Sequence, residues 1–79
     1  SVWEVYDSAA THYRDNGDMA AIPRVGQGAF QRFSGAPSAY PKLVALYRRH
    51  GLTKEMNAAL SECVLRQADK RDQCVDAAK

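Results

Sequence analysis

Apolar residues recur every three or four positions along the first fifteen residues of the chain, which is the spacing of one face of an α-helix. Asn16 and Gly17 follow, and a glycine in the left-handed conformation is a common helix end. The pattern therefore predicts a helix over residues 2–15. The apolar positions of its face are Val2, Trp3, Tyr6, Ala9, Ala10 and Tyr13.

The middle of the chain is rich in glycine and proline, which interrupt regular helices. Asp18 is placed to cap one short turn, and Pro23 follows too soon for that turn to grow into a long helix. The sequence therefore predicts a connector, followed by an irregular stretch over residues 24–40 with room for one short helix. The breakers in this stretch are Gly26, Gly28, Gly35 and Pro37, and the short helix is expected around Ala29, Phe30 and Phe33.

Two further helices are predicted on either side of Gly51. Pro41 suits the first turn of the earlier helix, and the basic run at residues 48–50 favours the negative end of its dipole. Gly51 ends that helix, Leu52 is placed to pack back onto its last turn, and Thr53 is placed to cap the next helix. The apolar faces consist of Leu43, Val44, Leu46 and Tyr47 and of Met56, Ala59, Leu60, Cys63 and Val64.

The apolar stripe breaks after Leu65 and resumes at Cys74, which leaves two arrangements open. A continuous helix over residues 54–79 would be about 39 Å long, longer than the roughly 25–30 Å expected across a compact domain of this size. A chain reversal within residues 68–71 avoids that length. However, residues 64–73 contain no glycine or proline, so local propensity favours the continuous helix.

The two cysteines bear on this choice, because they permit a single intramolecular disulfide, Cys63 to Cys74. In a continuous helix they would lie about 16.5 Å apart along the axis, whereas bridged Cα atoms lie about 4.4–6.8 Å apart. In a hairpin they would face each other, with Asp69 placed to cap the last helix and Asp72 in its first turn. We favour the disulfide, which would imply an exported protein, periplasmic or secreted, while free cysteines in a reducing cytosol are the alternative.

Composition places the chain among small folded proteins, since 46% of its 79 residues are apolar and 25% are charged. A chain this short forms one domain, residues 1–79. Its small core would be stabilised by a covalent cross-link, a metal or a partner surface. We predict an all-α bundle of three to five helices with a central loop rich in glycine and proline and a C-terminal helix hairpin. One core is expected to hold Trp3, Tyr6, Leu46, Tyr47, Leu60 and Val64.

No residues combine into a convincing catalytic, metal or cofactor site in the sequence. His12 and His50 are not at ligand spacing with each other or with the cysteines, and no nucleophile has an evident base and orienting group. The run Val25 to Phe30 superficially resembles a phosphate-binding glycine loop, but it lacks a third glycine and a preceding strand, so we interpret it as a plain loop. We therefore predict no enzyme, no cofactor and no small-molecule ligand.

The net charge of +2 is too small to indicate a nucleic-acid or membrane-surface protein, and no apolar run is long enough for a bilayer span, so no membrane insertion is predicted. Residues 43–62 resemble the helix-turn-helix family of DNA-binding motifs in their order of helix, glycine turn and helix. That family has a small residue where Tyr47 stands and an apolar one where Asn57 stands, and Glu55 and Glu62 would oppose phosphate. DNA binding is therefore the alternative interpretation.

By elimination, the sequence favours a small module that binds another protein through a helix face and the glycine-rich stretch. Aromatic side chains left outside a thin core, together with arginines, are typical anchors for a protein partner. The candidate partner-binding residues are Arg24, Phe30, Arg32, Tyr40, Arg48 and Arg49.

Overall fold

The computed structural model describes residues 2–33, 35–36 and 38–79, and these ranges contain helices and turns but no strand. Two short 3₁₀ turns, η1 (Met19–Ala21) and η2 (Ala68–Lys70), lie between longer helices. The predicted all-α bundle is confirmed. Its helices are α1 (Val2–Asp15), α2 (Ile22–Phe33), α3 (Ala39–Arg49), α4 (Thr53–Arg66) and α5 (Arg71–Ala78).

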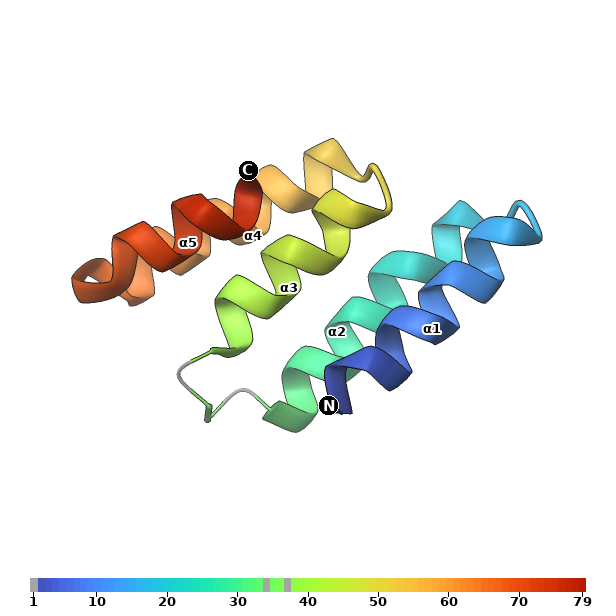
Figure 1. The fold of residues 1–79 in the computed structure, drawn as a ribbon, viewed down its shortest axis with the longest axis horizontal. Coiled ribbons are helices and arrows are strands. Elements are labelled where there is room, and N and C mark those ends of the chain that lie inside the picture. Colours follow the sequence, from blue (N-terminus) through green and yellow to red (C-terminus); the bar gives the residue numbers. More distant parts are fainter. Residues whose placement is uncertain (1, 34, 37) are drawn as a thin grey trace.

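Helix α3 is the centre of the molecule. It packs against α2 on one side and against α4 and α5 on the other, while α1 packs against α2. In Figure 1 the α1–α2 hairpin lies at one end of the molecule and the α4–α5 hairpin at the other, with α3 between them. The described chain is elongated, with principal extents of 38 × 22 × 16 Å.

The predicted glycine stops are confirmed at both positions, because Gly17 and Gly51 have φ angles of 78° and 75°. At the second stop the Gly51 amide donates to the carbonyl of Arg48 at 3.1 Å, and the Leu52 amide donates to that of Tyr47 at 3.0 Å. This is the paired bonding of a Schellman ending, which satisfies carbonyls that the helix leaves free. The Leu52 side chain packs against the core, as the sequence predicts.

The central loop is much shorter than predicted, because α2 runs without interruption through Pro23, Gly26 and Gly28. Pro23 lies in the first turn of the helix, where an amide has no partner within the helix in any case. Gly26 is buried against α3, and that packing offsets the low helix propensity of glycine. The run Val25 to Phe30 is therefore helical rather than a loop. The connection that remains is residues 34–38, and the predicted breaker Pro37 lies outside the described residues.

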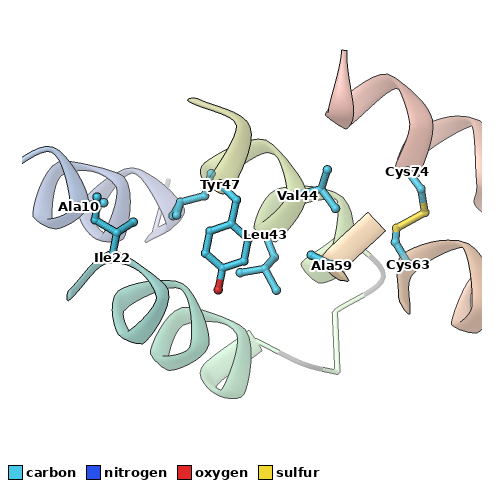
Figure 2. Close-up of a cluster of buried hydrophobic side chains, with 9 residues drawn as sticks. Ala10, Ile22, Leu43, Val44, Tyr47, Ala59, Cys63 and Cys74 are labelled. Atoms are coloured by element: carbon cyan, nitrogen blue, oxygen red, sulfur yellow. A yellow bond between two sulfur atoms is a disulfide. The ribbon is translucent and has the colours of Figure 1, made fainter. Parts of the chain in front are cut away.

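All five helices contribute to one apolar core, centred on α3 (Figure 2). Figure 2 places the Tyr47 ring in the middle of the cluster with its hydroxyl directed towards α2. The expected common core is confirmed, since Leu46 and Tyr47 are buried in it and Trp3, Tyr6, Leu60 and Val64 pack against it. Tyr13 departs from the predicted face of α1 because it is 38% exposed. Nothing is described for the side chain of Val2.

The C-terminal hairpin is present and is closed by the predicted disulfide. The chain reverses at η2, and the bond joins Cys63 of α4 to Cys74 of α5 with their Cα atoms 5.8 Å apart. Both cysteines are fully buried (Figure 2). Two predicted caps are wrong, because Asp69 lies inside η2 and Thr53 is already the first residue of α4. Asp18 does precede η1 at the cap position, but its side chain forms no cap hydrogen bond.

Candidate functional site

The six candidate partner-binding residues do not form one surface. Arg24 lines a shallow hollow with Tyr13 and Asp18, and Arg49 lines a second one beside Trp3. Phe30 and Tyr40 line a third hollow, which lies between α2, α3 and α4. Of the other two residues, Arg32 lies over the ring of Phe33 at 5.8 Å, and Arg48 donates from Nε to the carbonyl of Ala77 at 3.1 Å.

The third hollow, here called the α2–α4 groove, is the most apolar of these surfaces. Helix α3 forms its floor, and α2 and α4 form its two walls. Its volume is about 300 Å³, at the lower end of the range of small-ligand pockets. Its lining consists of Pro23, Gln27, Phe30, Tyr40, Leu43, Tyr47, Glu55, Ala58, Ala59 and Glu62.

Three aromatic rings shape the floor and one wall of the α2–α4 groove. Phe30 and Tyr40 are half-buried and pack together with ring centroids 4.6 Å apart. The Tyr47 hydroxyl donates to the carbonyl of Pro23 at 3.3 Å, which joins α3 to the start of α2. Burial raises the pKa of Tyr47, a hydrogen bond with Gln27 partly offsets this, and the negative charge of Glu55 raises it further.

Two carboxylates lie on the α4 wall of the groove. Glu62 is exposed and pairs with Arg66, whose Nε lies 3.1 Å from a carboxylate oxygen. Glu55 is half-buried, and within the part of the chain that the structure describes it forms no ion pair. The lining contains neither lysine nor arginine. From the sequence these glutamates are interpreted only as charges that would oppose DNA, and nothing in it predicts that they line the same groove as Phe30 and Tyr40.

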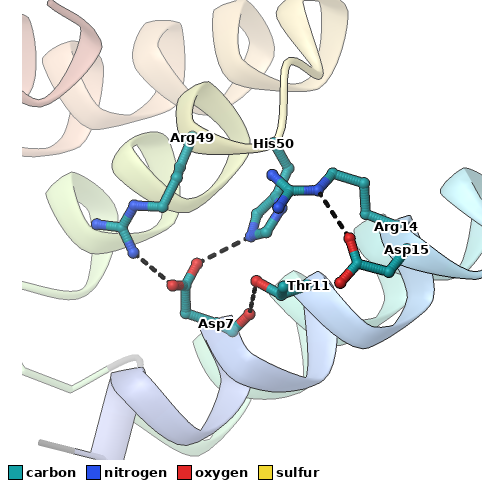
Figure 3. A network of polar contacts seen from close by, with 6 residues as sticks. All are labelled: Asp7, Thr11, Arg14, Asp15, Arg49 and His50. Carbon is teal, nitrogen blue, oxygen red and sulfur yellow. Dashed lines mark hydrogen bonds and ion pairs between the residues drawn. The ribbon is translucent and has the colours of Figure 1, made fainter.

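A polar cluster outside the groove joins α1 to the end of α3 (Figure 3). The Asp7 carboxylate accepts a bond from Arg49 at 2.6 Å and lies 2.9 Å from Nε2 of His50. Burial alone would raise the pKa of Asp7, but its hydrogen bonds to His50 and Arg49 and the charges of these groups outweigh that effect and lower it. The His50 side chain is fully buried. This cluster positions α1, and Arg49, which the sequence predicts to bind a partner, has an intramolecular partner in Asp7.

Among the described residues, no group of three or more histidine, cysteine or acidic side chains could hold a metal ion. None of the described helices is long and apolar enough to cross a bilayer. Comparison with protein-family models, curated proteins and solved structures found no match. The groove is therefore interpreted from its own geometry, and its apolar floor with an acidic wall suits recognition by packing and charge.

Proposed function

We propose that this chain is a small helical protein-binding module whose partner segment lies in the α2–α4 groove. The observation that carries the proposal is the groove itself, in which Phe30 and Tyr40 remain half-buried around a hollow of about 300 Å³. Aromatic side chains supply large contact areas and are enriched at the energetic centres of protein interfaces. A partner segment in the groove would complete the burial of these rings.

The intramolecular contacts of the arginines support protein binding over the DNA-binding alternative. Arg48 bonds the backbone of α5, and Arg49 bonds Asp7, so the two arginines that precede the turn of the resembling motif are engaged within the chain. Glu55 and Glu62 lie on α4, which would be the reading helix, and they would repel phosphate. These contacts favour a partner other than a polyanion.

We also propose that the module works in an oxidising compartment, as an exported protein. The support is the buried disulfide between Cys63 and Cys74. Disulfides form and persist outside the reducing cytosol, and small exported domains commonly use them to supplement a thin core.

The proposal is tested by filling the groove without touching the core. Ala58 is exposed and lines the groove, so Ala58→Trp would occupy the hollow, whereas Asn57→Trp adds the same ring at an exposed position of α4 outside the lining. Each immobilised protein is incubated with an extract of the native source. A protein retained by the wild type and by Asn57→Trp, but lost with Ala58→Trp, is the expected result.

Equal retention by all three proteins would show that the groove is not the binding surface. Binding to random duplex DNA that is tight, falls steeply with salt and is lost in the Arg48→Ala, Arg49→Ala double variant would favour the DNA-binding alternative instead.

A further inference from the structure

We propose that the α2–α4 groove recognises an arginine side chain of the partner, with the Glu55 carboxylate as its counter-ion and the aromatic rings as its walls. This inference rests on the proposed function and specifies the chemistry of the occupant. It is carried by three properties of the groove: an unpaired half-buried carboxylate, the aromatic rings that share its lining and the sign of the charge on that lining.

Glu55 supplies the unpaired charge. Its side chain is half-buried at the α4 wall, and no cation of the described chain pairs with it. A carboxylate on a groove wall without a counter-ion can pair with an incoming cation through charge-assisted hydrogen bonds. Glu62, on the same wall, already has such a partner in Arg66 at 3.1 Å. On this wall, therefore, Glu62 already has a counter-ion and Glu55 has none among the described residues.

The aromatic groups favour a guanidinium group over a simple ammonium group. Phe30 and Tyr40 present two packed, half-buried rings at the groove, and the buried Tyr47 also contributes to its lining. A guanidinium is planar, stacks on aromatic faces and can bind a carboxylate through two parallel hydrogen bonds. The methylene stem of arginine would pack on the apolar floor near Leu43.

The charge on the groove lining indicates that its ligand is positively charged. Among the described residues the lining of the groove has two carboxylates and no basic residue; Glu62 is paired with Arg66, so the unpaired charge is that of Glu55, although the chain as a whole has a net charge of +2. The groove is thus locally opposite in sign to the molecule that contains it. A partner segment with an arginine between apolar residues matches both the charge and the hydrophobicity of this surface.

The test compares two peptides that differ in charge and little in shape, acetyl-Leu-Arg-Leu-amide and acetyl-Leu-citrulline-Leu-amide. Each is titrated into the ¹⁵N-labelled, oxidised protein while amide chemical shifts are followed. We expect the arginine peptide to produce saturable shifts at Gln27, Tyr47 and Glu55. The citrulline peptide should bind about fivefold more weakly, the effect of losing a partly exposed ion pair of roughly 1 kcal/mol.

Two isosteric variants assign the effect to one carboxylate. Glu55→Gln should bind both peptides equally, whereas Glu62→Gln should retain the preference for arginine, because Glu62 is already paired with Arg66. Far-ultraviolet circular dichroism and thermal melting check that both variants fold as the wild type does.

Equal binding of the two peptides in the groove of the wild type would overturn the arginine assignment and leave the protein-binding proposal standing. Shifts confined to residues outside the groove, or no saturable shift for the arginine peptide up to about 10 mM, would also overturn it. The protein-binding proposal itself would be contradicted by a different experiment, in which the wild type and Ala58→Trp retain the same partner equally.

Discussion

The ring of Tyr47 lies against the bare backbone of Gly26, so closely that a Cβ atom on residue 26 would be 2.7 Å from the tyrosine hydroxyl. Glycine is thus required here for close approach of two helices rather than for an unusual backbone conformation. The contact brings α2 against α3 and holds the Tyr47 hydroxyl next to the carbonyl of Pro23. One wall of the α2–α4 groove is positioned by this contact.

Gly26→Ala should therefore destabilise the protein by about 1–3 kcal/mol, the usual cost of overpacking a core, although alanine is the better helix former. The matched control is Gly28→Ala in the same helix. No atom of the described residues lies within 4 Å of its added Cβ, so this variant should gain about 0.5–1 kcal/mol. Urea unfolding followed by circular dichroism measures both, and a stabilised Gly26→Ala would show that Tyr47 can move at little cost.

Asp7→Asn should lower the free energy of unfolding by about 1–2 kcal/mol at pH 7, because hydrogen bonds to a charged group are among the stronger ones. The pKa of Asp7 is lower in the folded chain than its ordinary value of 3.8. Its contribution is therefore complete above the unfolded pKa and is lost as the pH falls through the folded pKa. The difference between wild type and Asp7→Asn should shrink below about pH 4.

Asp15→Asn is the control for that experiment, because Asp15 is exposed and lies 3.8 Å from the exposed Arg14. It should change stability by less than about 0.5 kcal/mol. A difference between wild type and Asp7→Asn that stays constant from pH 7 to pH 2 would contradict the role assigned to the Asp7 carboxylate.

Reduction of the Cys63–Cys74 disulfide should lower the free energy of unfolding by about 2–3 kcal/mol, because the bond restricts the unfolded chain. Helix α5 has eight residues, too few to persist alone, so its amides should lose protection from hydrogen exchange before those of α3. The denatured, unreduced protein should contain no thiol that reacts with an alkylating agent. Two reactive thiols per chain in natively produced protein would show that Cys63 and Cys74 are not joined by a disulfide.

Gly51→Ala should cost about 1–2 kcal/mol, because residue 51 has a φ of 75° and an alanine is strained in that region. Within the described part of the chain nothing lies within 4 Å of an added Cβ there, so the cost is one of backbone conformation and not of packing. Gly51→Asn should cost less, since asparagine tolerates the left-handed conformation. Equal losses in thermal unfolding of the two variants would contradict this explanation.

Local patterns were sufficient for the helix of residues 2–15, for the stops at Gly17 and Gly51, and for the hairpin that joins Cys63 to Cys74. In each case the deciding residues lie within a few helical turns of one another. Helix α2 was missed because Gly26 and Gly28 read locally as breakers, whereas the reason for Gly26 is a ring 21 positions further along the chain.

Less of the candidate site than of the fold can be predicted from the sequence. The sequence names Phe30 and Tyr40 as candidate partner-binding residues, and the structure places both in the groove. The sequence does not predict Glu55 as part of the site, because its place in the same groove depends on how α4 crosses α3. The pairing of Asp7 with His50 spans 43 residues and has no local signature at all.

The order of the helices in space largely follows their order in the chain, since α1 packs on α2, α2 on α3, α3 on α4 and α4 on α5. Helical proteins rich in such local contacts fold in microseconds to milliseconds. Disulfide formation takes seconds to hours. The C-terminal hairpin should therefore form before its cysteines are oxidised, so that the bond between Cys63 and Cys74 secures a hairpin already made and does not guide the search for it.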